Sequence, residues 1–250
     1  MTKVVEVCAK PFEEHQCEFE SEAEVMNPEQ LHRDGYALLR GLVPADWLDD
    51  LRAAFDACET PSAQWRVPRG PDWRHSMLDL DPTIQAVCRL PALLAVVGEL
   101  IGERFFLAQV EGREPLMGGG HQGLHRDFSA RRPGDTVNVM VFFDDYGPSN
   151  GATRYVAGSH RDGAVTAPAT PEDEARSVQI SGKAGDALVF DANLLHGASL
   201  NPSGERRRSI LIGYFAESLY STHLETAPLR SVRMDTSERF DPPSAALATS

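Results

Sequence analysis

The chain changes character near Arg104, and this change constrains the fold more than any other feature. From there on, short runs rich in β-branched and aromatic residues alternate with turn clusters such as Gly118-Gly119-Gly120 and Asn201-Pro202-Ser203-Gly204. Short runs bounded by Gly, Pro, Asn and Ser are typical of strands in a sandwich or barrel. We expect strands at residues 105–110, 123–128, 137–143, 152–156, 178–180, 187–190 and 209–215.

The part of the chain before Arg104 predicts helices instead. Asn27 followed by Pro28 is typical of a helix start, and Gly35 would end that helix. A brief strand at 36–41 should follow. Further helices should begin at Pro44, Pro82 and Pro91. Helices first and strands afterwards predict a mainly β protein with N-terminal helices packed outside the β-core.

We expect a single domain over residues 27–220. Its helices, within residues 27–103, would support a β-core at 104–220. Residues 1–26 form an acidic N-terminal segment: residues 1–30 hold eight Glu against two Lys, a net charge of −6. Residues 221–250 form a C-terminal extension with a flexible end.

Composition excludes several classes of partner. The formal net charge is −13, whereas nucleic acid and anionic lipid both need a basic surface. No apolar run approaches the ~18 residues of a membrane span, and the start lacks the pattern of a secretory signal. The four cysteines form no CxxC pair, which favours reduced thiols. We therefore expect a cytoplasmic protein without nucleic-acid or membrane partners.

The triplet His-Arg-Asp occurs three times, at residues 32–34, 125–127 and 160–162. Residues i and i+2 share a face only on a strand, so only His125 and Asp127, in a predicted strand, could grip one metal ion together. The first triplet lies in a predicted helix and the third in a predicted loop. We expect surface or loop positions for His15, His75, His121 and His223.

A third metal ligand is available at His196, which follows the strand predicted at 187–190 and precedes Gly197, where the chain can turn. Two histidines and one carboxylate on one face of an ion leave positions open for substrate and O2. This arrangement is the signature of non-haem Fe(II) oxygenases.

A basic residue at the start of an apolar strand forms the next candidate site. Arg207 and Ser209 are i and i+2, so they share a strand face at the start of the run 209–215. A guanidinium and a hydroxyl on one face suit a carboxylate ligand. The alternative is that the run Arg206-Arg207-Arg208 is exposed to solvent at the start of the strand and binds no ligand.

These motifs in this order resemble the phytanoyl-CoA dioxygenase family over about residues 31–216. The resemblance is carried by His125-Arg126-Asp127, by the runs 144–152 and 156–161, and by His196-Gly197 with Arg207 eleven residues on. The opening run 34–44 is also similar to that of the family. The family implies a double-stranded β-helix, also called a jelly roll or cupin-like fold, and an Fe(II)- and 2-oxoglutarate-dependent dioxygenase.

The resemblance also implies roles for individual residues. His125, Asp127 and His196 would bind Fe(II), and Arg207, assisted by Ser209, would bind the distal carboxylate of 2-oxoglutarate. Gln109 would contact the same cosubstrate. The enzyme would consume O2 and convert 2-oxoglutarate to succinate while oxidising an unactivated C–H bond. The carboxylate of Asp127 favours hydroxylation over halogenation.

The substrate should be a small molecule, such as a biosynthetic intermediate or an acyl thioester. Asn138 and Met140 would line its pocket, and Met140 replaces a Trp common in the family. The Arg- and Trp-rich loop 64–74 would be either a lid that reads an anionic group or a surface loop that caps the core. Its candidate substrate contacts are Trp65, Arg69, Trp73 and Arg74.

Two other functions remain open on the same residues. A metal-dependent enzyme without oxidative chemistry, such as a zinc hydrolase, would use the same three ligands but would need a general base beside the metal. A non-catalytic cupin-like binding protein would share only the fold.

Overall fold

Two antiparallel sheets make up the β-core of the computed structural model, which describes residues 27–58, 70–74, 78–127, 133–161 and 168–243. A six-stranded sheet has the order β1-β8-β5-β10-β3-β2, and a four-stranded sheet has the order β4-β9-β6-β7. The strands are β1 (Tyr36–Leu39), β2 (Trp73–Arg74), β3 (Phe105–Arg113), β4 (Gln122–His125), β5 (Thr136–Phe142), β6 (Thr153–Tyr155), β7 (Val178–Gln179), β8 (Ala187–Asp191), β9 (His196–Ala198) and β10 (Ser209–Ala216).

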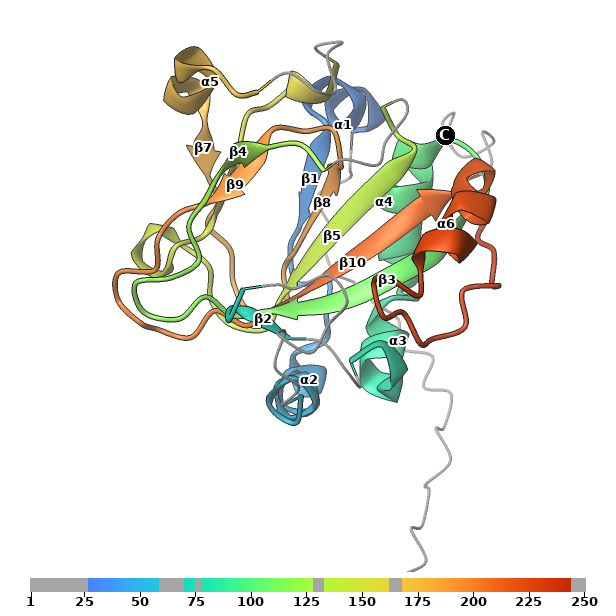
Figure 1. The fold of residues 1–250 in the computed structure, drawn as a ribbon, viewed down its shortest axis with the longest axis horizontal. Helices are drawn as coiled ribbons and strands as arrows, with labels where there is room; N and C mark the ends of the chain where they lie inside the picture. Colours follow the sequence, from blue (N-terminus) through green and yellow to red (C-terminus); the bar gives the residue numbers. More distant parts are fainter. Residues whose placement is uncertain (1–26, 59–69, 75–77, 128–132, 162–167, 244–250) are drawn as a thin grey trace, which may run out of the picture.

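Most helices lie outside the large sheet or at its ends, and one lies beside β7 of the small sheet (Figure 1). This arrangement confirms the predicted mainly β class with N-terminal helices. The helices are α1 (Pro28–Asp34), α2 (Leu48–Asp56), α3 (Pro82–Val87), α4 (Pro91–Ile101), α5 (Pro171–Arg176) and α6 (Tyr220–Thr226), with 3-10 turns at Ala45–Trp47, Leu78–Leu80, Pro148–Asn150, Ser159–Arg161 and Glu217–Leu219.

The helix starts predicted at Pro28 and Pro82 are correct because side-chain caps fix them, whereas the helix predicted from Pro44 begins with a 3-10 turn and becomes an α-helix at Leu48. The Asn27 side chain accepts hydrogen bonds from the backbone of Glu29 and Gln30, and Gly35 ends α1 with φ 78°. Asp81 caps α3 in the same way. Each cap satisfies backbone N–H groups that the first turn of a helix leaves without partners.

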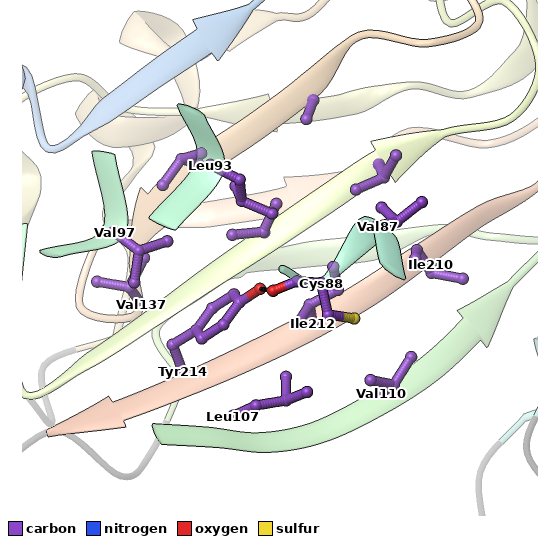
Figure 2. Packing of buried hydrophobic residues seen from close by; sticks show 14 of the residues in the cluster. Val87, Cys88, Leu93, Val97, Leu107, Val110, Val137, Ile210, Ile212 and Tyr214 are labelled. Carbon is purple, nitrogen blue, oxygen red and sulfur yellow. Dashed lines mark hydrogen bonds between the residues drawn. The ribbon is translucent and has the colours of Figure 1, made fainter. Parts of the chain in front are cut away.

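The large sheet separates an apolar core from the cavity. On β5 the side chains of Val137, Val139 and Val141 enter the main hydrophobic cluster under the helices, whereas Asn138 and Met140 line the cavity. This alternation is the period of two expected of a strand with two different faces. Figure 2 shows the same cluster, in which the hydroxyl of Tyr214 donates to the carbonyl of Cys88 at 2.6 Å.

Two local predictions are corrected, and two short strands were not predicted. The strand predicted at 123–128 ends at His125, so Asp127 lies just beyond it. The strands β2 and β9 are short, and their sequences carry no alternating pattern that would have predicted them. His160, expected in a loop, lies in a 3-10 turn and is buried.

The C-terminal residues lie against the core. The helix α6 sits beside the ends of β3 and β10 (Figure 1), and Phe240 pairs with Phe105 in an antiparallel bridge. No helix in the part of the chain that the structure describes is long and apolar enough to cross a bilayer.

Candidate metal centre

His125, Asp127 and His196 meet between the two sheets, and we call these three residues the metal centre. One ligand atom from each lies within 4.8 Å of the other two. The Nε2 atoms of His125 and His196 each lie 3.7 Å from a carboxylate oxygen of Asp127. These distances are too long for hydrogen bonds and suit three ligands around a single ion.

The hydrogen bonds of the two histidines leave their metal-facing nitrogens ready to bind. Nδ1 of His125 lies 2.9 Å from the carbonyl of Gly123, and Nδ1 of His196 lies 2.9 Å from the carbonyl of Leu194. A carbonyl can only accept, so each Nδ1 carries the proton and each Nε2 keeps a lone pair. Metal-binding histidines are usually oriented in this way. Burial also lowers the pKa of His196, against the opposing charge of Asp127, and this favours the neutral form that a metal needs.

Strand pairing explains why these residues meet. His125 on β4 lies opposite His196 on β9. The two strands come so close at Gly197 that a Cβ there would lie 2.6 Å from the carbonyl oxygen of Gln122. We expected Gly197 to permit a turn. It lies instead inside β9, where the absence of a side chain lets the two ligand strands approach.

Asp127 is held in place from both sides. Its backbone N–H donates to the carbonyl of Ala192 at 2.9 Å. The side-chain amide of Asn138, on β5, donates to its carboxylate at 2.5 Å. These two bonds place the Asp127 carboxylate beside the His125 ring, where both could bind one ion, although Asp127 lies beyond the end of β4.

Arg207 is fully buried, and its guanidinium nitrogens have no hydrogen-bond partner among the described residues. Its guanidinium carbon lies 4.5 Å from the centre of the Tyr146 ring. An unpaired buried cation is costly, so its presence indicates a bound anion as partner. A carboxylate matches the two-pronged geometry of a guanidinium.

The Tyr146 ring, which lies against the guanidinium of Arg207, also connects this arginine to Ser209 and Met140. The hydroxyl of Tyr146 lies 2.8 Å from the hydroxyl of Ser209 and 3.2 Å from the sulfur of Met140. Met140 lines the cavity. The arginine therefore lies beside the end of the cavity where β10 begins.

A cavity of about 490 Å³ contains the metal centre. Its floor is a grid formed by three neighbouring strands of the large sheet. In one row Glu111, Leu211 and Met140 are in register, and in the next row Gln109, Gly213 and Asn138 are in register. Its side walls come from β4, β6 and β9, and one end comes from α6 and the residues after it.

The residues predicted to contact substrate divide into three groups. Asn138, Met140 and Trp73 line the cavity. Arg74 does not: it donates to the carbonyls of Pro71 and Trp73 and lies 3.7 Å from Glu114. The candidates Trp65 and Arg69 lie outside the described residues.

Comparison with known proteins shows to which protein family this chain belongs. Residues 31–209 match the phytanoyl-CoA dioxygenase (PhyH) family. The chain belongs to the phytanoyl-CoA dioxygenase family. The predicted family is therefore confirmed, and the match runs from within α1 to the first residue of β10 and includes all three residues of the metal centre.

Several curated proteins are similar in sequence to this chain. Dioxygenase cdmA of Talaromyces verruculosus is 32% identical over 149 residues, which cover 56% of this chain and 44% of that protein. L-proline trans-4-hydroxylase of Streptomyces griseoviridis is 26% identical, over 56% of this chain and 65% of that protein. The chain thus spans less than half the length of the first of these relatives.

Solved structures confirm the predicted jelly-roll fold. The epimerase SnoN, solved with Fe³⁺, α-ketoglutarate and nogalamycin RO, has a TM-score of 0.65 and 19% identity, covering 87% of this chain and 94% of that chain. AviO1 from Streptomyces viridochromogenes has a TM-score of 0.61 and 21% identity, covering 76% and 94%. The family match and the name of a similar protein, the Fe(II)/2-oxoglutarate-dependent dioxygenase nvfF of Aspergillus novofumigatus, support the predicted enzyme class, an Fe(II)- and 2-oxoglutarate-dependent dioxygenase.

Among the cavity residues that were not predicted from the sequence are two polar residues of the C-terminal segment. His223, expected at the surface, is 1% exposed and lines the cavity from α6. Arg230, in the segment expected to be an extension, lines the cavity beside it. The sequence of α6, YSTHLET, has no series of apolar residues at helical spacing that would indicate a buried helix, so no pattern pointed to either residue.

His223 is a neutral acceptor in the folded protein. An arginine can only donate, so the Arg230 guanidinium, 2.8 Å away, donates to Nδ1, and the proton on Nε2 donates to Thr236. Burial, together with the charges of Arg230 and Arg239, lowers the pKa of His223 to about 4.

This lowered pKa predicts a specific loss of stability in acid. In the unfolded chain His223 has a pKa of ~6.5, whereas in the folded protein its pKa is about 4. Between these two pH values the unfolded chain binds the proton and the folded protein does not, so acidification favours unfolding. The contribution of neutral His223 to the free energy of unfolding is fully present above about pH 6.5, and it falls by about 2 kcal/mol on acidification to about pH 5. We expect His223→Gln to lose less stability than the wild type over this interval. Urea unfolding at both pH values measures the difference, and equal losses would contradict the assignment.

Proposed function

We propose that this protein is an Fe(II)- and 2-oxoglutarate-dependent dioxygenase that oxidises an unactivated C–H bond of a small-molecule substrate. The buried Arg207, whose guanidinium has no hydrogen-bond partner in the part of the chain that the structure describes, carries this proposal, because it needs an anion beside a cavity that also contains the metal centre. A family match and relatives with iron and 2-oxoglutarate in their names support the same cofactors.

The residues of the metal centre fit Fe(II). Two neutral imidazoles and one carboxylate are the ligand set of the facial triad, which leaves positions for a chelating cosubstrate and for O2. Iron bound there would supply the chemistry that couples decarboxylation of 2-oxoglutarate to succinate with oxidation of the substrate. Asn138 would keep the Asp127 carboxylate oriented toward the ion.

The cosubstrate would bind at the end of the cavity where β10 begins, at Ser209. We propose that Arg207 pairs with the distal carboxylate of 2-oxoglutarate and that the Ser209 hydroxyl, which contacts Tyr146, assists. The Tyr146 ring covers one side of the guanidinium and helps to exclude water. Water exclusion strengthens the ion pair, because the attraction between charges rises in a low-dielectric site. A contact between Gln109 and the cosubstrate stays a prediction.

The rest of the cavity is available to the substrate. Relatives act on proline and on natural products, as their names and the ligand of SnoN indicate. We propose a small molecule for this chain as well, with Trp73, Asn138 and Met140 among its contacts. A single oxygenase domain over residues 27–220 and a cytoplasmic location also remain proposals.

Consumption of 2-oxoglutarate tests the proposed function directly. We expect the purified protein to produce succinate from 2-oxoglutarate only with Fe(II) and O2, and faster with a true substrate. We also expect Mn(II) to tighten 2-oxoglutarate binding in a calorimetric titration without turnover. If 2-oxoglutarate binds equally with and without metal, the dioxygenase assignment is wrong. A metal-dependent hydrolase or a binding protein would then account better for the site.

A further inference from the structure

Arg207 lies outside the regular part of its strand. β10 begins at Ser209, and its pairing with both β5 and β3 starts at that residue. The guanidinium of Arg207 is nevertheless fully buried, and its nitrogens have no hydrogen-bond partner among the described residues. A buried cation gains free energy by returning to water, so contacts outside the strand pairing have to hold this arginine in place.

The arginines on either side of Arg207 are held from the side of α2. Arg206 and Arg208 both bind the carboxylate of Asp56, the last residue of α2, whereas Arg207 between them is buried. Opposite directions for alternate residues are expected of an extended chain. α2 lies near the end of the large sheet where β10 begins (Figure 1). The chain therefore enters β10 with two arginines facing α2 and one facing the interior.

Asp144 binds the main chain at this point as well as a side chain. Its Oδ2 accepts from the backbone N–H of Arg208 at 2.9 Å and from Nε of the same residue at 2.8 Å. Its Oδ1 accepts from Nη2 of Arg208 at 2.8 Å. The backbone N–H belongs to the peptide group that joins Arg207 to Arg208. Asp144 therefore fixes the main chain directly after Arg207.

The segment that carries Asp144 is itself tied to the sheet and to α2. The backbone N–H of Phe143 donates to the carbonyl of Arg208 at 2.9 Å, which extends the pairing of β5 and β10 by one residue. Nε of Arg52, on α2, donates to the carbonyl of Phe143 at 2.9 Å. The side chains of Arg208 and Asp144 are only 10% and 15% exposed, so water competes weakly for their hydrogen bonds.

We propose that Asp144 is a positioning residue for cosubstrate binding: by fixing the peptide group after Arg207, it keeps the Arg207 guanidinium buried beside the cavity. The Tyr146 ring, two residues beyond Asp144, lies 4.5 Å from the guanidinium carbon. The run 144–146 thus holds Arg207 through the main chain and covers it with a ring. The proposal deepens the proposed function and rests on it, since Arg207 is there the residue that binds the distal carboxylate.

A purely structural role for Asp144 gives different expectations. Asp144 could stabilise the fold through its ion pair with Arg208 and leave Arg207 unaffected. Asp56 provides the matched control, because it also pairs with the Arg208 guanidinium, at 2.9 Å, and with Arg206. Asp56→Ala removes charge pairs but leaves the hydrogen bond between Asp144 and the Arg208 backbone in place. A difference between the two variants therefore reports on the main-chain contact.

The first test compares two keto acids that differ by one methylene, 2-oxoglutarate and 2-oxoadipate, in calorimetric titrations with Mn(II). A fixed arginine selects the length that spans the metal and the guanidinium, so the wild type should prefer 2-oxoglutarate by at least ~10-fold. Asp144→Ala should weaken 2-oxoglutarate binding by at least ~10-fold and lose most of this preference, because an arginine that moves can meet either acid. Asp56→Ala should keep both the affinity and the preference.

The second test follows Arg207 itself and needs no cosubstrate. Phenylglyoxal modifies arginines that solvent reaches, and mass spectrometry of the peptides locates the modified residue. We expect Arg207 to be protected in the wild type and in Asp56→Ala. It should react at least ~10-fold faster in Asp144→Ala, because loss of the main-chain contact lets the buried cation reach water. Asp144→Asn keeps one oxygen for the Arg208 N–H, so it should give an intermediate rate.

Each outcome decides the proposal. Equal effects of the Asp144 and Asp56 substitutions, or a folded Asp144→Ala that keeps Arg207 protected, would overturn it. A lower melting temperature of Asp144→Ala with an unchanged preference between the two acids would also overturn it, since Asp144 would then act on stability alone. If Asp144→Ala fails to fold, Asp144→Asn is compared with Asp56→Asn in both tests. If the wild type binds neither keto acid, the proposed function fails, and the reactivity of Arg207 still decides whether Asp144 positions it.

Discussion

Replacing Arg207 by Ala should weaken 2-oxoglutarate binding on the order of 100-fold, from the loss of ~3 kcal/mol when a buried charge pair is broken on one side. In the wild type, the guanidinium is fully buried and has no hydrogen-bond partner among the described residues, so a bound carboxylate would be its natural partner. In the variant, the distal carboxylate would enter the same buried space without a cation. The measurement is the half-saturating concentration of 2-oxoglutarate with Fe(II).

The neighbouring Arg206 provides the matched control. It binds Asp56 and Glu114 and its side chain is half exposed, so Arg206→Ala should leave 2-oxoglutarate affinity almost unchanged. Equal losses in the two variants, or a larger loss at Arg206, would overturn the assignment.

Thermal stability gives a second readout that does not depend on turnover. Without cosubstrate, Arg207 is a buried charge with no pairing anion among residues 27–58, 70–74, 78–127, 133–161 and 168–243, so Arg207→Met should melt at the same temperature as the wild type or higher. Added Mn(II) and 2-oxoglutarate should stabilise the wild type more than this variant, because ligand binding to the folded state raises its stability. A large destabilisation of Arg207→Met without ligand would indicate a structural role instead.

The fold could be predicted where local signals and the tertiary structure agree. Asn27 and Asp81 cap helices through their own side chains, so the sequence alone locates those starts. The strand β5 alternates between core and cavity over its whole length. The two-residue strand β2 and the three-residue strand β9 depend on their partners in the sheet, and no pattern of period two can form in so few residues.

The grouping of His125 with Asp127 could be predicted because both side chains belong to one motif. They lie two residues apart, and a histidine and a carboxylate at this spacing are typical of metal ligands. His223 and Arg230 reach the cavity only because α6 folds against the ends of β3 and β10, and neither has a neighbour that suggests binding. The loop 64–74 was expected to be either a lid that reads an anionic group or a cap on the core; its Arg74 lies outside the cavity, and its Arg69 lies outside the described residues.

The three His-Arg-Asp triplets have identical sequences and different surroundings, so they provide a direct test of the metal centre. His32 lies exposed on α1, where its Nε2 lies 3.0 Å from a carboxylate oxygen of Glu99. His160 is buried against Gly35, and its Nε2 donates to the carbonyl of His32 at 3.0 Å. Neither belongs to a group of three metal-binding side chains among the described residues.

We therefore expect His125→Ala and Asp127→Ala to abolish iron binding, whereas His32→Ala and His160→Ala retain it. Changing a partner of a metal ligand typically weakens binding by ~10–100-fold, so removing a ligand itself should cost more than that. His160→Ala should lower the melting temperature, because it leaves a cavity beside Gly35 and removes a buried hydrogen bond. The measurement is iron per chain after anaerobic reconstitution, together with the melting temperature of each variant. If His160→Ala or His32→Ala empties the site in a folded protein while His125→Ala leaves it filled, the metal centre is wrongly assigned and the function built on it fails.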